Sequence, residues 1–207
     1  ESQPMRRRLT LMAMAIGALL TASCSDDDGS TTFPSMWNEI VCLTTDGQGR
    51  INRLLTDEGK SYMVTNNITG RTPNVAYRMM CGYTIEGQQA TLYQMIGVHV
   101  LRDSTACAAH DPLKAIAVWK SGSYINLHLA PLTQGGNHSW GFVTDSIGTD
   151  GHRYLSLHHR QNGDPLSYTQ ETYASIPLEE LDSMTEGDSI TLSIHTFKGI
   201  KTWNFKR

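Results

Sequence analysis

Apolar residues alternate with polar ones along most of this chain, in short runs separated by glycine, proline, asparagine or aspartate. Successive side chains of a β-strand point to opposite faces, so alternation with period two is typical of strands with one buried face. In Ile190–Thr196, for example, isoleucine, leucine and isoleucine occupy every second position. The pattern predicts an all-β protein, and only Leu178–Met184, which follows Pro177, favours a short helix.

Residues 36–111 form the first predicted domain. The strands expected there are Trp37–Thr45, Arg50–Leu55, Lys60–Val64, Val75–Ile85 and Gln89–Arg102, with Glu86–Gln88 as a hairpin turn. Five strands in so short a segment favour a small barrel of the OB type.

Residues 112–207 form the second predicted domain, and Ser104–Pro112 interrupt the strand pattern between the two. The strands expected there are Ile116–Lys120, Tyr124–Leu129, Trp140–Asp145, Tyr154–His159, Thr172–Ile176, Ile190–Thr196 and Lys198–Lys206. Many short strands at this spacing predict a β-sandwich.

Residues 1–23 have the composition of a secretory signal peptide, with Met5 as the expected start. A cluster of three arginines, Arg6–Arg8, precedes the uncharged run Leu9–Leu20. That run is shorter than the ~20 residues of a membrane-spanning helix but suits a signal peptide. The residues at the end of this run, Leu20–Cys24, resemble a bacterial lipobox. In a lipobox, the thiol of the cysteine, here Cys24, accepts diacylglycerol. We therefore expect a lipid anchor on Cys24; the alternative is an ordinary signal peptide followed by a free cysteine.

Residues 24–35 are expected to be a flexible tether that begins with Cys24 and an acidic run, Ser25, Asp26, Asp27 and Asp28. The run resembles the export signal of surface-exposed lipoproteins in Bacteroidetes. It predicts an outer-membrane lipoprotein on the cell surface. If the run is only a solvated tether, the protein could face the periplasm instead.

The charge balance and the motifs argue against two classes of function. With 17 Lys and Arg against 20 Asp and Glu, the formal net charge is −3, so we expect no nucleic-acid partner. Cys-x-x-Cys, His-Glu-x-x-His, Gly-x-Ser-x-Gly and phosphate-loop patterns are all missing from the sequence. We therefore expect no catalytic residue, cofactor or metal site. With Cys24 acylated, Cys42, Cys81 and Cys107 remain, and this odd number leaves at least one thiol unpaired. For Cys42 and Cys81, core thiols and a disulfide both remain open.

Two neighbouring histidines test the strand register. His158 and His159 fall on one predicted strand, so they point to opposite faces and cannot chelate one metal ion together. His159 shares a face with Leu155 and Leu157, which predicts a buried, hydrogen-bonded ring. His158 lies on the polar face and is expected to be solvated.

Four Asp-Ser-X sites resemble the O-glycosylation acceptor of exported Bacteroidetes proteins, with Ser104 and Ser146 as the preferred acceptors. Aspartate and serine also favour turns, which is a sufficient structural reason for such pairs.

The second half of the chain resembles NigD-like lipoproteins. The residues that carry the resemblance are Tyr124–Leu127, Asn137–Val143, Leu155–His159 and Gly163–Asp164. The resemblance implies an N-terminal OB domain and a C-terminal β-sandwich behind a lipoprotein signal. An immunity-type role beside a bacteriocin is also implied, but no catalytic residue.

Together these observations favour a lipid-anchored, non-enzymatic envelope protein that binds an unknown protein or glycan. Asn126, His138, His159 and Asp164 either form a ligand cluster or organise the loops of the sandwich. The alternatives are a bacteriocin-immunity protein, an envelope hydrolase and a structural accessory of an envelope assembly. A hydrolase would need a cleft where a carboxylate or serine meets a histidine.

Overall fold

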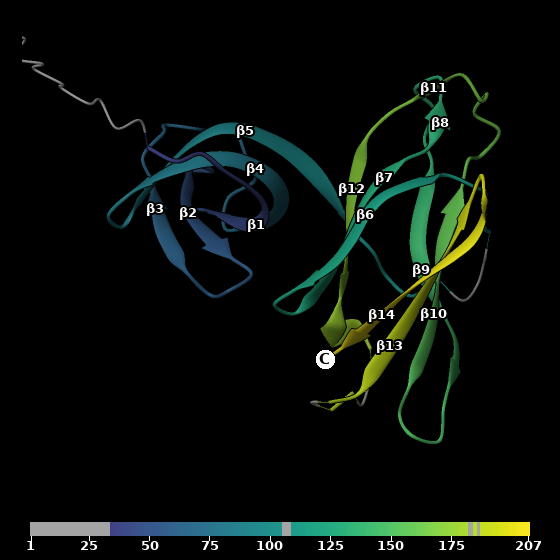
Figure 1. Ribbon diagram of the computed structural model, residues 1–207. Coiled ribbons are helices and arrows are strands. Elements are labelled where there is room, and N and C mark those ends of the chain that lie inside the picture. Colours follow the sequence, from purple (N-terminus) through teal and green to yellow (C-terminus); the bar gives the residue numbers. More distant parts are fainter. Residues whose placement is uncertain (1–33, 105–108, 182–183, 186) are drawn as a thin grey trace, which may run out of the picture. The chain divides into compact units, whose positions relative to one another are not determined.

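The computed structural model describes residues 34–104, 109–181, 184–185 and 187–207 (Figure 1). The predicted signal peptide, Cys24, the acidic run Ser25–Asp28 and Cys107 lie outside the described residues. Within the described ranges, no helix has the length and apolarity needed to cross a membrane.

The first five strands form a partly closed ring. They are β1 (Trp37–Thr45), β2 (Ile51–Thr56), β3 (Ser61–Val64), β4 (Ala76–Glu86) and β5 (Gln89–Val100). They pair in the order β3-β2-β1-β4-β5, and a parallel pairing of β3 with β5, at Met63–Gln89 and Val64–Ala90, closes the ring. The prediction of a small N-terminal barrel is confirmed in this partly closed form.

The interior of the barrel follows from the alternation in the sequence. Every second residue of a strand points inward, so Val41 and Leu43 of β1 meet Cys81 and Tyr83 of β4 in one buried cluster. The remaining members of this cluster are Ile51, Leu54, Ala90 and Leu92.

The remaining strands build a β-sandwich (Figure 1). One sheet contains β6 (Lys114–Ser121), β7 (Tyr124–Ala130) and β12 (Thr172–Pro177), beside the end of β5. The other contains β9 (Ser139–Ile147), β10 (Arg153–Arg160), β13 (Ser189–Thr196) and β14 (Gly199–Lys206), in the order β14-β13-β10-β9. A two-stranded ribbon joins β8 (Leu132–Thr133) to β11 (Tyr168–Thr169). The predicted sandwich is therefore confirmed.

Strand β5 belongs to both parts of the fold. Its first residues pair with β3 and β4 of the barrel. Its last three, Val98–Val100, run parallel to Tyr173–Ser175 of β12 in the sandwich. A single uninterrupted strand therefore connects the two parts.

The sandwich core lies between its two sheets. Leu127 and Ile176 come from one sheet, and Phe142, Leu155 and Leu192 come from the other; all are fully buried members of one cluster. Transfer of such side chains out of water contributes about 1.5–3 kcal/mol each, so this cluster is the main apolar contribution to the second half.

The predicted helix Leu178–Met184 is wrong in length and type. Among the described residues of this segment, 178–181 and 184, the helical geometry is limited to a three-residue 3₁₀ turn, η2 (Leu178–Glu180), after Pro177. Leu181 then leaves helical geometry, with φ −95° and ψ 88°, and its side chain joins the sandwich core together with Leu178. Core burial of these two leucines outweighs the helix propensity of the segment.

Candidate functional site

Pairing of β9 with β10 fixes the centre of the candidate site. The antiparallel register sets His159 opposite Trp140, on the same face of the sheet. Their rings stack at 4.4 Å between centroids, with 25° between the planes. His159 is 1% exposed. This burial agrees with the sequence analysis, which places the His159 ring on the same buried face of the strand as Leu155 and Leu157.

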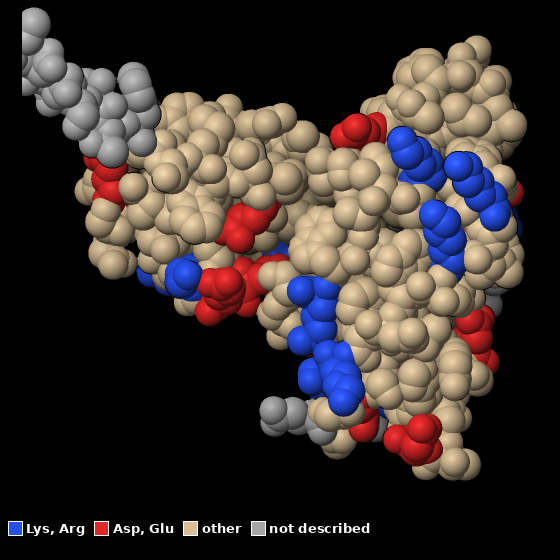
Figure 2. Space-filling model, in the orientation of Figure 1, with Lys and Arg blue, Asp and Glu red and all other residues tan. Residues whose placement is uncertain are grey.

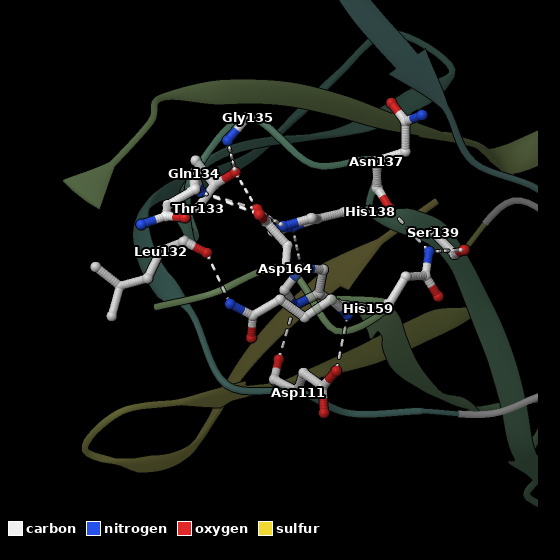
Figure 3. Close-up of polar contacts among 12 residues, drawn as sticks. Asp111, Leu132, Thr133, Gln134, Gly135, Asn137, His138, Ser139, His159 and Asp164 are labelled. Carbon is white, nitrogen blue, oxygen red and sulfur yellow. Dashed lines mark hydrogen bonds and ion pairs between the residues drawn. The ribbon is translucent and has the colours of Figure 1, made fainter. Parts of the chain in front are cut away.

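A line of hydrogen bonds runs from His159 to the loop after β10 (Figure 3). His159 Nδ1 lies 2.8 Å from the carbonyl oxygen of Asp111, and His159 Nε2 lies 2.9 Å from His138 Nδ1. His138 Nε2 in turn lies 3.1 Å from Asp164 Oδ2. We call Asp111, His159, His138 and Asp164 the histidine chain.

Asp164 is held as a carboxylate by several donors. The Thr133 hydroxyl and the Gln134 backbone N–H, at 3.0 Å, both donate to it. The hydrogen bond from Thr133 and that from His138 lower the pKa of Asp164, against the opposing effect of burial. Gly136 is required beside it, because a Cβ there would lie 2.6 Å from Asp164 Cγ.

All four ring nitrogens of the histidine chain contact protein atoms. Burial lowers the pKa of His159 and favours its neutral form. The contact with the Asp111 carbonyl, which can only accept, places the ring proton of His159 on Nδ1. The Nε2 atom of His159 then accepts from His138 Nδ1, and His138 Nε2 faces the Asp164 carboxylate.

A small cavity of about 170 Å³ opens beside this chain. Trp140 and His99, whose rings stack at 5.6 Å, line one part of it, and His138 lines another. The other lining residues are Pro131, Thr133, Gly136, Asn137, Gln170 and Thr172. Aromatic rings, amides and hydroxyls in one cavity suit a polar group that also presents an apolar face.

The predicted environment of His158 is wrong. Its side chain points away from His159 but is also buried, at 3% exposure. The backbone N–H of Ala109 donates to His158 Nδ1 at 2.7 Å, because the segment before β6 crosses the polar face of β10. Burial, together with Arg160 and His110, lowers the pKa of His158.

Asn126 lies away from the histidine chain, although the sequence analysis grouped it there. Its Oδ1 accepts hydrogen bonds from Arg78, at 3.1 Å, and from Ser175, at 2.6 Å. Arg78 also forms a two-pronged ion pair with Asp57, with one contact at 2.7 Å. We call Arg78, Asp57, Asn126 and Ser175 the junction cluster, because Arg78 and Asp57 belong to the barrel and the other two to the sandwich.

The other predicted residues are dispersed. Ser104 lies beside β9, where its backbone N–H donates to Phe142, and Ser146 is exposed near the end of β9. Cys42 and Cys81 are free thiols. Within the described ranges, no three His, Cys, Asp or Glu side chains are arranged to hold a metal ion.

Sequence reasoning missed several partners in these clusters. Asp111 contributes a backbone carbonyl, which no side-chain pattern could indicate. Thr133 falls in no predicted strand, and Trp140 was identified only as part of a strand and of the residues that carry the family resemblance. Arg78 and Asp57 are 21 positions apart, and no local motif joins them.

Comparisons with known proteins place this fold. A NigD-like immunity protein from Bacteroides caccae is 24% identical, with a TM-score of 0.63, and the match covers 84% of this chain and 93% of that one. A protein of unknown function from Bacteroides vulgatus is 15% identical, with a TM-score of 0.67 over 84% of this chain and 91% of the other. A candidate lipoprotein from Bacteroides fragilis is 11% identical, with a TM-score of 0.59 over 84% and 97%. These likenesses show a shared fold.

Family-level sequence comparison is more specific. No curated protein matches this sequence significantly. The family model for the NigD-like C-terminal beta sandwich domain matches residues 98–207, which include the whole histidine chain. Since that match spans more than half of the sequence, the chain belongs to the NigD-like family.

Proposed function

We propose that this NigD-like protein is a lipid-anchored envelope protein that acts by binding a partner. Anchoring would take place at Cys24, and the acidic run Ser25–Asp28 would direct the protein to the outer surface. The fold shared with a candidate lipoprotein of Bacteroides fragilis supports the anchored class.

The cavity beside Trp140 is the observation that carries the binding proposal. Its volume of about 170 Å³ is below the ~300–1,000 Å³ of pockets that enclose a whole small molecule. It therefore suits one group of a larger partner, such as a single sugar unit of a glycan. The ring of Trp140 would stack on that group, and the amides of Asn137 and Gln170 would hydrogen-bond to it.

Hydrogen bonding within the protein favours binding over catalysis. A general base needs a ring nitrogen that is available to the substrate at about 2.6–3.2 Å. Both nitrogens of His138 and both of His159 are already bonded to protein atoms. The histidine chain therefore supports the shape of the cavity wall and offers no ring nitrogen of its own as a base, while His99, which also lines the cavity, is stacked on Trp140.

NMR titration with methyl glycosides of glucose, galactose and N-acetylglucosamine tests the binding proposal. At least one glycoside should shift the indole resonance of Trp140, and Asn137→Ala or Gln170→Ala should weaken that response several-fold. Gln94→Ala, an exposed amide on the barrel strand β5, is the matched control and should leave the response unchanged. If no glycoside shifts the resonance, the glycan form of the proposal is rejected.

The anchor and its orientation have a separate test. Cys24→Ala should abolish labelling by a fatty-acid analogue and release the protein from membranes. Replacing Asp26, Asp27 and Asp28 with alanine should leave labelling intact but protect the protein from external protease on whole cells. Unchanged labelling or unchanged cleavage would reject the corresponding part of the proposal.

An immunity-type role is the second candidate, and the likeness to the NigD-like immunity protein of Bacteroides caccae favours it. In that case the partner would be a toxin, and loss of the protein should sensitise its own cells to a bacteriocin from the same strain. Equal survival of deleted and complemented cells would reject this role.

A further inference from the structure

A second cavity, of about 350 Å³, lies at one end of the sandwich, away from the histidine chain. It is bordered by the start of β6, by the β8–β11 ribbon and by the hairpin between β13 and β14. The lining residues that matter here are Leu113, Ala115 and Phe197, together with three lysines, Lys114, Lys198 and Lys201.

The floor of this cavity is continuous with the sandwich core. Leu113 is fully buried in the core cluster, and Ala115 packs against the same cluster. The backbone N–H of Leu113 donates to the His195 carbonyl at 3.2 Å, which holds the start of β6 against the end of β13. An alkyl chain in the cavity would therefore bury its methylene groups against core side chains, which is favourable because it removes apolar surface from water.

The β13–β14 hairpin presents an aromatic ring and a charge at the rim. The Thr196 hydroxyl accepts a hydrogen bond from the Lys198 N–H, at 3.2 Å, and donates one to the Gly199 carbonyl, at 2.6 Å. Gly199 has φ +98°, a conformation that side chains rarely adopt. This tight turn holds Phe197, which is 46% exposed, next to Lys198.

Three lysines give the rim a single sign of charge. Lys114, Lys198 and Lys201 are exposed, and none of them has an ion-pair partner among the residues that the structure describes. The residues that line the cavity include no acidic one. In Figure 2, basic side chains gather over the part of the sandwich where Figure 1 places the start of β14.

We propose that this cavity binds a single-chain amphiphile with an anionic carboxylate head, of the fatty-acid class. The apolar floor would take the alkyl chain, and the lysine rim would take the carboxylate. A volume of about 350 Å³ is at the lower end of small-molecule pockets, which fits one chain better than a two-chain phospholipid. The site does not depend on the cavity beside Trp140, so the two proposals can fail separately.

Isothermal titration with dodecanoate below its micelle concentration tests the site. Dodecanol and dodecyltrimethylammonium serve as neutral and cationic probes of equal chain length. We expect dodecanoate to bind at least ten-fold more tightly than either of them. The double substitution Lys198→Glu and Lys201→Glu should weaken dodecanoate binding at least ten-fold.

The matched control reverses two charges on strands that also border the cavity. Lys120→Glu and Lys206→Glu lie on β6 and β14 but outside the cavity, so they should change the affinity less than two-fold. Ala115→Phe, which fills the floor, should weaken dodecanoate and dodecanol binding alike, and thermal melting of each variant checks folding.

Three outcomes would overturn the proposal. The first is no dodecanoate binding by the wild-type protein. The second is equal binding of all three probes, which would indicate a surface for an apolar protein segment. The third is equal weakening by the rim and the control substitutions, which would indicate non-specific charge attraction.

Discussion

The junction cluster and the histidine chain are both buried polar networks, yet they use different chemistry. In the junction cluster, Arg78 and Asp57 have side chains only 3% and 4% exposed, and the Arg78 guanidinium lies 3.7 Å from the ring centroid of Tyr124. Burial by itself would lower the pKa of Arg78, but its bonds to Asp57 and their charge attraction raise it. The guanidinium of Arg78 therefore stays charged at physiological pH.

The histidine chain, by contrast, is built from two imidazole rings where the junction cluster has a guanidinium and a carboxylate. It borders a cavity, whereas the junction cluster lies between barrel and sandwich strands. One network therefore joins two parts of the fold, while the other shapes a surface. Breaking the junction cluster should for this reason cost more stability than breaking the histidine chain.

Loss of Arg78 should have the largest effect on stability. Arg78→Met leaves the Asp57 carboxylate buried without its main partner, and such breakage of a buried pair costs about 3–5 kcal/mol. Urea denaturation measures the free energy of unfolding. The double variant Arg78→Met with Asp57→Leu should recover much of the loss, and no recovery would contradict this explanation.

The junction also predicts a large effect at Gly122. This residue has φ +51°, and a Cβ there would lie 2.2 Å from the Asp57 carbonyl oxygen. Gly122→Ala should cost about 2–4 kcal/mol, from backbone strain plus the displaced turn. Gly163→Ala is the matched control, because Gly163 has φ +81° with nothing within 4 Å, so only strain of about 1–2 kcal/mol applies. Equal losses in urea melts would show that the close approach to Asp57 does not matter.

In the sandwich, His159→Ala and His158→Ala should each lower the free energy of unfolding by about 1–3 kcal/mol. Each substitution removes a buried ring and leaves a buried hydrogen-bonding group unsatisfied: for His159 the Asp111 carbonyl, and for His158 the Ala109 N–H. Denaturant melts with and without zinc and EDTA provide the measurement. A zinc-dependent midpoint that disappears in His159→Ala would contradict the purely hydrogen-bonded description of this ring.

The smallest effect should be a pH dependence that arises in the sandwich. The pKa of His158 is lowered in the folded protein, so the unfolded chain takes up its proton first as the pH falls below about 6.5. The stability that the neutral His158 ring contributes is therefore complete above about pH 6.5. It is lost as the pH decreases toward the lowered pKa of His158 in the folded protein. When the pH is lowered from 7.5 to 5.5, the free energy of unfolding should therefore decrease more for the wild type than for His158→Asn, as urea denaturation at each pH would measure.

The junction cluster supplies the control for this pH series. The stability difference between wild type and the double variant Arg78→Met with Asp57→Leu should stay constant across the same interval, because that variant removes the ion pair as a whole and the raised pKa of Arg78 keeps its guanidinium charged in the wild type. A difference that varies with pH as strongly as the His158 difference would contradict the expected contrast between the junction cluster and the buried histidine of the sandwich.

Much of the fold could be predicted from periodicity, because alternating burial makes each strand visible locally. Strand β1 begins and ends at the predicted residues, and most other strands differ by one or two positions. The strands β8 and β11 have only two residues each, too few to show a period. The helix after Pro177 was overestimated because Leu178 and Leu181 are core residues of the sandwich rather than one face of a helix.

The candidate site was only partly predictable, for reasons that involve distant segments. The face of His159 follows from its own strand, so its burial could be inferred. The burial of His158 depends on Ala109, 49 positions away, which covers a face that looks polar in the sequence. In the sequence, Asn126 was grouped with the histidines because it is a polar residue on a predicted strand. In the structure it accepts a hydrogen bond from Arg78 of the barrel instead.

Because β5 pairs with strands of both the barrel and the sandwich, the gene cannot be divided cleanly between the two parts. The family model begins at residue 98, within this strand, so the unit that is recognised in sequence is not a unit that can be cut out cleanly. A fragment that begins there would retain only three residues of β5 beside β12, and it would lack Arg78 and Asp57 beneath Asn126. Recombination that exchanges the C-terminal domain between relatives must therefore preserve the partners of β12 and Asn126, or the transplanted sandwich would expose a sheet edge and a buried amide.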